Sequence, residues 1–596
     1  MTRPAFVLRG LLAATALALL GSAGAAQPAA SRLMTNAALR NPAPAALPVD
    51  IPATVEEGRR FLAMASFGAS DDGIARLMKI GVGAWIDEQW QVPATSHRAY
   101  WEARDAAIRA ADPLSTGATT NEVLESFWKH ALTGQDQLRQ RVAYALSQIF
   151  VLSAQDSDVA NQPRALADWL DMLNLAGPSQ YRAFIEVVAR HPLMGRYLTH
   201  LRNQKADAAS GRVPDENFAR EVIQLFSIGV VRLNADGTPM LVNGAPLETY
   251  GPADVSGMAR VFTGFSFACP AFPANGCFYS GSSNGVSDPD REFKAMRGYP
   301  NFHEKGEKKF LGATIAPQAT ADPDASLRVA LDTLATHPNV GPFISKQLIQ
   351  RLVTSNPSPA YVSAVAAVWA DNGAGVRGDI KAVVRAILTH PELLNVSNRD
   401  GKLREPVLRL SAYLRAFPHL SDTGRFRVGN TDNPGTQLGQ TPLRAPSVFN
   451  FYRPGYLAPG SQSAAAGMVA PELQLLNESS VAGWVNFMRD NLTSGVGGYN
   501  GTVDGTVYNR RDLQRNWLVE MDWAKKPTGL VYLLAERLLY GQPAETLKND
   551  VIAAVSAITV PTATPTNQTA VNNALRDRVK VAMLLLLASP EFLVQK

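Results

Sequence analysis

Four ionisable residues from three separated segments could together perform proton transfer or bind a metal ion: Glu216, Glu221, Asp254 and His303. Carboxylates brought close together raise one another's pKa, which suits a general acid, or they attract a divalent cation that offsets their repulsion. His303 could then shuttle a proton or supply one nitrogen ligand. With one histidine and several oxygens, such a site fits Mg²⁺, Ca²⁺ or Mn²⁺ better than a zinc ion held by thiolates.

The first of the three segments predicts a helix with one polar face. At 100° per residue, Asn217, Arg220, Glu221 and Gln224 share an arc of the helix, and the apolar residues of the segment lie on the other side. An exposed face with an ordinary Glu216–Arg220 ion pair explains the same pattern. From the segment alone, both interpretations stay open.

The other two segments place further charges beside the candidate carboxylates. Residues 250–264 predict a capped helix in which Asp254 either serves the site or only starts the helix. Residues 302–312 form a loop dense in ionisable groups around His303. The residues that we expect to contact substrate, in particular an anionic group, are Asn217, Arg220, Arg260 and Lys308.

Common catalytic signatures are missing from the chain. The sequence has no nucleotide-binding P-loop, no Gly-x-Ser-x-Gly, no His-Glu-x-x-His and no Cys-x-x-Cys. The type of chemistry therefore cannot be taken from a standard motif.

The elements that must position these residues are mostly helices. Hydrophobic periodicity predicts a mainly α fold, a large multi-helix domain with a small β-hairpin insertion at 230–250 and long loops, the longest at 265–312. The expected helices cover residues 56–66, 71–79, 82–90, 120–132, 138–152, 163–175, 181–189, 193–201, 216–228, 324–354, 360–371, 380–390 and 405–416.

Three helices are expected to end in a His-Pro dipeptide, at His191, His337 and His390. Proline cannot continue the preceding helix but is well suited to begin the next one. We therefore predict that these histidines mark helix boundaries and are not metal ligands.

The N-terminus carries the pattern of a secretory signal. Arg3 and Arg9 precede the apolar run 11–20, and Ala-Gly-Ala at 23–25 fits a signal-peptidase site. We expect a signal peptide over 1–25, an Ala/Pro-rich linker over 26–52, and a helical domain over 53–596 with a possible internal boundary near 455–470. The mature protein would then be periplasmic or secreted, with no membrane span after cleavage.

Charge and cysteine content agree with an exported, soluble protein. The formal net charge of the whole chain is only +5, and removal of the two signal arginines lowers it further, which argues against binding of nucleic acid. Cys269 and Cys277 are the only two cysteines, and they flank a short Pro- and Gly-containing loop. In an oxidising compartment we expect them to form a disulfide.

Several sequence blocks resemble a bacterial family known as domain of unknown function 1800. The resemblance covers nearly all of the mature chain, and the block DENFARE at 215–221 is its most specific part. Many relatives have Asp where this chain has Glu304, directly after the loop histidine. The other blocks are RFLAMASFG at 60–68, RQRVAYALSQ at 139–148, HPLMG at 191–195, ARVFTG at 259–264, the His303 loop, APSVFNFY at 445–452 and SPEF at 589–592.

The resemblance implies an exported protein whose activity is not known. Members often accompany a second exported family, domain of unknown function 1501, which resembles sulfatases and alkaline phosphatases and is therefore a candidate partner. Two classes of function remain open. The protein is either a hydrolase or lyase of cell-envelope or extracellular polymer that uses the Glu/Asp/His site, or a non-catalytic helical scaffold whose charges form a structural network. An open pocket at Glu221, Asp254 and His303 would favour the enzyme, and fully paired charges would favour the scaffold.

Overall fold

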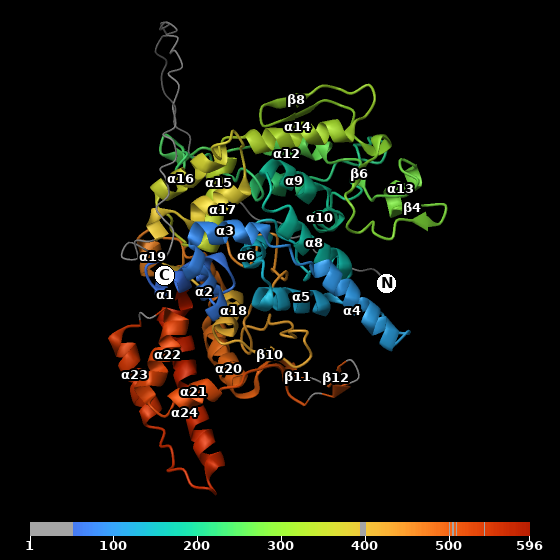
Figure 1. Ribbon diagram of the computed structural model, residues 1–596. Coiled ribbons are helices and arrows are strands. Elements are labelled where there is room, and N and C mark those ends of the chain that lie inside the picture. Colours follow the sequence, from blue (N-terminus) through green and yellow to red (C-terminus); the bar gives the residue numbers. More distant parts are fainter. Residues whose placement is uncertain are drawn as a thin grey trace. The chain divides into compact units, whose positions relative to one another are not determined.

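The computed structural model describes residues 52–393, 401–499, 501–503, 506–507, 509–540 and 543–595. Within these ranges the chain is mainly α-helical, with 25 helices and small antiparallel sheets, as predicted (Figure 1). The predicted signal peptide and nearly all of the predicted linker lie outside the described residues. None of the helices in the described ranges is long and apolar enough to cross a membrane.

A first hydrophobic core is built largely by the N-terminal two thirds of the described chain. Phe150, Trp169, Phe184 and Trp369 are among its fully buried side chains. The helices of this part are α1 Val55–Ala65, α2 Asp71–Ile80, α3 Val82–Gln91, α4 His97–Ala111, α5 Thr120–Thr133, α6 Gln137–Ser147, α7 Ser157–Ala160, α8 Pro163–Leu175, α9 Tyr181–Arg190, α10 Pro192–Tyr197, α11 Asn217–Gln224, α12 Pro252–Val261, α13 Asn275–Ser280, α14 Pro323–Thr336, α15 Val340–Leu352, α16 Pro359–Ala370 and α17 Ile380–Leu388.

A second hydrophobic core takes most of its residues from Val407 onward and also includes Phe67, Phe127 and Tyr144 of the N-terminal helices. The long helix α24 packs against α20, α21, α22 and α23 in this part (Figure 1, orange to red). The apolar run 581–588 lies in the C-terminal half of α24, as a helical segment of this core. The helices are α18 Pro406–Ala416, α19 Gln462–Ala465, α20 Glu478–Ser494, α21 Leu518–Trp523, α22 Pro527–Leu539, α23 Glu545–Ser556, α24 Gln568–Ala588 and α25 Pro590–Leu593.

The strands are short and pair locally, with three exceptions: β3 pairs with β6, β9 pairs with the C-terminal β15, and β10, β14 and β11 form a three-stranded sheet. The predicted hairpin at 230–250 is present, with Asn243 and Gly244 both at positive φ in its turn. The strands are β1 Leu241–Val242, β2 Ala245–Pro246, β3 Phe265–Ser266, β4 Ser282–Ser283, β5 Val286–Ser287, β6 Arg297–Gly298, β7 Lys308–Phe310, β8 Ala313–Ile315, β9 Lys402–Leu403, β10 Leu420–Ser421, β11 Val496–Tyr499, β12 Thr502–Val503, β13 Thr506–Val507, β14 Arg511–Gln514 and β15 Val594–Gln595.

The His-Pro dipeptides mark helix boundaries, as predicted. In each of them the backbone N–H two residues further on donates to Nδ1 of the histidine, at 3.2 Å for His191, His337 and His390 alike. The imidazole therefore caps the element that follows the proline. In each case Nδ1 is the acceptor of this hydrogen bond.

The expected ranges omit α4 and, in the C-terminal part, the long helices α20, α22, α23 and α24. Helix α4 shows why periodicity can miss a helix. It is rich in charged residues, and only His97 and Trp101 of its fifteen residues are buried. Its polar sequence left too few apolar positions to show a repeat. Ser96 caps its first turn by accepting a hydrogen bond from the Ala99 N–H.

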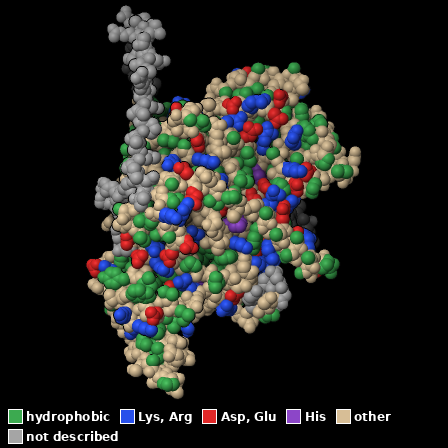
Figure 2. All heavy atoms as spheres, in the orientation of Figure 1, with side chains coloured by type: hydrophobic (Ala, Val, Ile, Leu, Met, Phe, Trp, Pro, Cys, Tyr) green, Lys and Arg blue, Asp and Glu red, His purple; other side chains and the backbone are tan. Residues whose placement is uncertain are grey.

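The surface mixes charges of both signs. On the face shown in Figure 2, Lys and Arg side chains lie among Asp and Glu side chains and do not form a separate basic region. Cys269 and Cys277 form the expected disulfide, which links the segment after β3 to α13.

Candidate functional site

The DENFARE block forms α11, and most of its charges are exposed or paired. Glu216 accepts a hydrogen bond from the Ser256 hydroxyl at 2.5 Å, and its other oxygen lies 3.3 Å from Nη2 of Arg220. Asn217 is exposed, and its side-chain amide lies 3.5 Å from the Thr199 hydroxyl. Glu216 and Arg220 therefore form the ordinary surface ion pair that was one of the two interpretations of this segment.

Glu221 differs from the other charged residues of this block. Its side chain is buried, with 6% exposure, and Oε2 has no hydrogen-bond partner within the described part of the chain. Burial raises the pKa of Glu221, and the nearby Arg220 guanidinium only partly opposes this effect. Glu221 is therefore the one carboxylate of the three segments with the environment of a general acid.

Asp254 has a structural role at the start of α12. Its Oδ2 accepts from the Gly251 N–H at 2.8 Å, and its Oδ1 accepts from the Leu311 N–H at 2.6 Å. Leu311 has a positive φ of 49°, in the turn between β7 and β8. The carboxylate therefore caps the helix and fixes this turn at the same time.

His303 is fully buried, and both ring nitrogens have partners. Nδ1 lies 2.8 Å from the Thr263 carbonyl oxygen, and Nε2 lies 2.9 Å from the Ser326 hydroxyl. The neutral ring with its proton on Nδ1 satisfies both contacts. Burial lowers the pKa of His303 to about 4, although the Thr263 carbonyl favours the charged form. The ring joins α12, the 302–312 loop and α14.

Arg260 and Lys308, which we expected to contact an anion, both have hydrogen-bond partners within the fold. Arg260 is exposed and donates to the Glu307 carbonyl oxygen at 3.0 Å. Lys308 is buried, its Nζ lies 3.4 Å from the Gly306 carbonyl oxygen, and burial lowers its pKa.

The three segments are neighbours, because α11 packs on α12 and α12 packs on β7. Their ionisable side chains, however, are bound by different partners. Among the described residues, no group of three or more His, Cys, Asp or Glu side chains could hold a metal ion. Glu221, Asp254 and His303 are therefore not brought into one metal-binding group.

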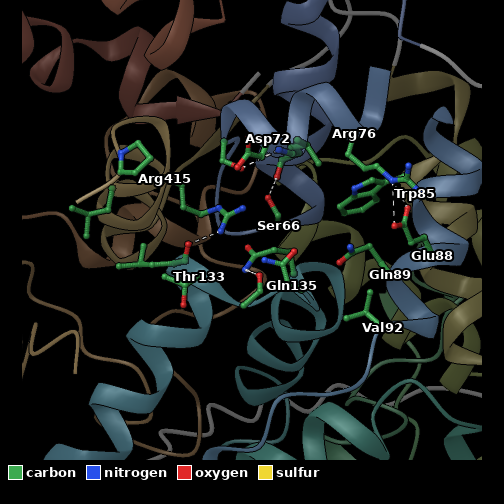
Figure 3. Close-up of a pocket in the computed structure, with 18 of the residues that line it drawn as sticks. Ser66, Asp72, Arg76, Trp85, Glu88, Gln89, Val92, Thr133, Gln135 and Arg415 are labelled. Carbon is green, nitrogen blue, oxygen red and sulfur yellow. Dashed lines mark hydrogen bonds and ion pairs between the residues drawn. The ribbon is translucent and has the colours of Figure 1, made fainter. Parts of the chain in front are cut away.

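Two cavities lie elsewhere. The first, named here the Arg415 cavity, has a volume of about 370 Å³ and is lined by α1, α2, α3 and the end of α5 (Figure 3). Arg415 reaches into it and donates to the carbonyl oxygens of Gly68 at 2.6 Å and Leu132 at 2.9 Å. Arg76 and Glu88 face each other at one side as an ion pair. The two arginines of this cavity, Arg76 and Arg415, thus already have partners.

The second, named here the Arg351 cavity, has a volume of about 440 Å³ and is lined by two arginines, three glutamines and apolar side chains. It lies where two of the sequence blocks meet α11: Gln148 ends the 139–148 block, Gln224 is the last residue of α11, and Val448 and Phe449 belong to the 445–452 block. Helix α15 contributes Phe343, Gln347 and Arg351.

Unpaired donors distinguish the Arg351 cavity from the Arg415 cavity. Nε2 of Gln347 and both Nε and Nη1 of Arg351 are buried and have no hydrogen-bond partner within the described residues. Nη2 of Arg351 makes only a long contact, 3.4 Å, to the Gln148 carbonyl oxygen. Buried polar groups in folded proteins are nearly always paired, so unpaired donors beside a cavity are typical of a binding site.

Glu405 holds the wall of this cavity in place. Its side chain is fully buried, and Oε2 accepts from Nε2 of Gln148 and Nε2 of Gln440, both at 2.6 Å. The hydroxyls of Tyr144 and Tyr452 lie 3.1 Å and 3.3 Å from the same oxygen. One carboxylate therefore connects the 139–148 block with the 445–452 block.

The sequence analysis named Gln224 but missed Gln347, Arg351, Arg453 and Glu405. A signal existed in the 139–148 block, where polar residues occur on every side of a helix that is buried along its whole length. Such a helix must use its polar side chains inside the protein, since none of them reaches solvent. Nothing in the sequence distinguished Arg351 from a surface arginine.

Comparison with known proteins agrees with the resemblance of the sequence blocks. Residues 60–594 match a family described as protein of unknown function (DUF1800). No curated protein and no solved structure matches the chain. Because the match extends over nearly the whole sequence, the chain belongs to the DUF1800 family.

Proposed function

We propose that this protein is an exported, non-catalytic helical binding protein that receives a ligand in the Arg351 cavity. The observation that carries the proposal is the distribution of hydrogen-bond partners. Glu216, Asp254 and His303 already have partners in the fold, whereas Nε2 of Gln347 and Nε and Nη1 of Arg351 have none within the described residues. Buried donors without partners cost free energy, so a ligand that pairs with them would stabilise the fold.

A second candidate function, a hydrolase or lyase of envelope polymer, rests on Glu221 alone. Its burial and raised pKa suit a general acid. Hydrolysis of a glycoside ordinarily needs a second carboxylate beside the first. Arg220 is the only charged neighbour that shifts the pKa of Glu221 among the described residues. The binding role is therefore favoured over the enzymatic role.

Replacement of Glu221 by glutamine separates the two candidates. The carboxylate is buried without a full set of partners, so Glu221→Gln is expected to raise the free energy of unfolding at pH 7.5 by about 1 kcal/mol. Because a raised pKa means that the native state binds the proton more tightly, the gain should shrink as the pH falls toward 5. Urea unfolding at both pH values measures the effect.

The same two proteins are incubated with peptidoglycan and with acidic polysaccharide, and released reducing ends are measured. The binding proposal expects no release by either protein. If the wild-type protein releases reducing ends and the Glu221→Gln variant does not, the protein is an enzyme that uses Glu221. Glu216→Gln, on the same helix but exposed, is the matched control for both measurements.

Export is part of the proposal and has its own test. The small residues at 23–25 predict a mature N-terminus near Ala26 or Gln27. N-terminal sequencing of protein recovered from the native host should find it, and intact Met1 in the cytosolic fraction would contradict export. The pairing with a member of the domain of unknown function 1501 family remains a prediction from the family resemblance.

A further inference from the structure

From the charges around the Arg351 cavity we infer that its ligand is an organic anion, a carboxylate or phosphate attached to an aromatic or branched apolar group. The inference rests on the proposed binding function and specifies its ligand. Three features of the structure carry it: the lining of the cavity, the unpaired guanidinium, and an excess of buried positive charge behind it.

The lining combines positive charge with apolar surface. Arg351 and Arg453 are its two charged residues, and none of the described lining residues is acidic. Phe343, Val448 and Phe449 are among its apolar residues. Phe449 is 39% exposed and Arg453 is exposed, so the mouth of the cavity faces solvent. Sites of this size with a few placed polar groups are typical of small-molecule binding.

Arg351 is positioned to meet an anion. It is 2% exposed, and its guanidinium carbon lies 4.9 Å from the centroid of the Tyr452 ring, which fixes its plane. No carboxylate of the described residues forms an ion pair with it, and Nε and Nη1 are unpaired. A guanidinium binds a carboxylate or phosphate in a bidentate manner through Nη2 together with either Nε or Nη1, so an anion here would replace the long contact between Nη2 and the Gln148 carbonyl oxygen.

Behind Arg351 the buried charges do not balance. Glu405 and Glu472 are the fully buried carboxylates of this cluster, and Glu472 is paired with Lys402 at 2.6 Å. The buried cations of the same cluster outnumber them: Arg141, Arg351, Lys402, Arg404 and Arg409.

Part of this excess is met by the C-terminal end of α15. Arg141 donates to the Arg351 carbonyl oxygen at 2.6 Å, and Lys402 donates to the Gln350 carbonyl oxygen at 2.8 Å. Burial still lowers the pKa of Arg141 and of Lys402, and it lowers the pKa of Arg409 to about 9. An anion bound beside the Arg351 guanidinium would supply the missing negative charge.

The experiment measures binding of three probes to the purified full-length protein by isothermal titration calorimetry: phenylacetate, phenyl phosphate and the neutral 2-phenylethanol. The proposal expects at least one anion to bind at least tenfold more tightly than 2-phenylethanol, and more weakly as salt is added. The two anions distinguish a carboxylate ligand from a phosphate ligand.

Variants locate the site. Arg351→Gln is expected to weaken anion binding about 10- to 100-fold, since it removes a charge-assisted hydrogen bond from a dry site. Arg453→Gln, an exposed position where the fold is not at risk, should weaken it about 3- to 10-fold. Arg76→Gln removes an arginine from the Arg415 cavity and is the matched control, with no expected change.

The inference is overturned if neither anion binds more tightly than 2-phenylethanol, or if Arg453→Gln and Arg76→Gln have equal effects. In that case the proposed binding function still stands unless the polymer assay finds cleavage that depends on Glu221. The two proposals therefore fail by different measurements.

Discussion

Lowering the pH from 7 to 5 is expected to remove about 6 kcal/mol of stability through three buried histidines, His97, His200 and His303. Each is at most 1% exposed, and burial lowers the pKa of each to about 4 from an ordinary value of 6.5. In the unfolded chain these side chains become protonated below about pH 6.5, whereas in the native state they stay neutral until about pH 4. The unfolded state therefore binds more protons in this window, and stability falls as the pH falls, by about 2 kcal/mol per histidine at pH 5.

Three buried carboxyl groups act in the opposite direction. Burial raises the pKa of Glu125, Asp171 and Glu221, so the native state takes up protons at these groups first. Each of them stabilises the fold as the pH falls. Burial also lowers the pKa of His130 to about 4 and that of His419 to about 3, and these two groups add to the loss. Single substitutions must therefore isolate the contribution of each histidine.

His200→Gln isolates one histidine. Nε2 of His200 donates to the Ala189 carbonyl oxygen at 2.9 Å, and the glutamine amide can reproduce this bond. The slope of unfolding free energy against pH between 6 and 5 should fall by about 1.2 kcal/mol per pH unit. Phe218→Leu is the control, because it disturbs the ring stacked on His200 at 3.7 Å and leaves the titrating group in place. An unchanged slope in His200→Gln would mean that His200 titrates alike in both states.

The helices were predictable where local chemistry fixes their ends. The range 163–175 matches α8 at both ends, since Pro163 occupies the first turn. The helix predicted to run to residue 228 ends at Gln224. Its continuation is disrupted by Ser227, whose hydroxyl donates to the Val222 and Ile223 carbonyl oxygens. The Ser227 hydroxyl bonds to carbonyl oxygens of the backbone only in a particular side-chain rotamer. Hydrophobic periodicity contains no information about that rotamer.

The site was less predictable than the fold, for a physical reason. The sequence identifies which side chains can ionise, but the partner of each one is set by tertiary contacts. Asp254 is satisfied by the Leu311 N–H and His303 by the Ser326 hydroxyl, and both partners come from other elements. Arg351, in contrast, is distinguished by its place: like Arg141 it is buried without an ion pair among the described residues, but it also lines a cavity. Spacing along the chain carries no information on either outcome.

Replacement of Glu405 by alanine is expected to lower the free energy of unfolding by about 3–5 kcal/mol, because it removes the only carboxylate that Gln148, Gln440 and the two tyrosines share. It also leaves buried cations such as Arg141 with less negative charge nearby. Glu405→Gln keeps the volume and loses the charge, so a smaller cost of about 1.5–3 kcal/mol is expected.

Urea unfolding followed by tryptophan fluorescence measures both losses, with Glu216→Ala as an exposed control that should cost less than about 1 kcal/mol. Glu405→Gln also removes one of the two negative charges behind Arg351, so phenylacetate or phenyl phosphate is expected to bind more tightly to this variant. A Glu405→Ala protein as stable as the control would mean that the two blocks hold together without this carboxylate. Loss of stability with unchanged anion affinity would mean that the buried charges behind Arg351 do not contribute to anion binding.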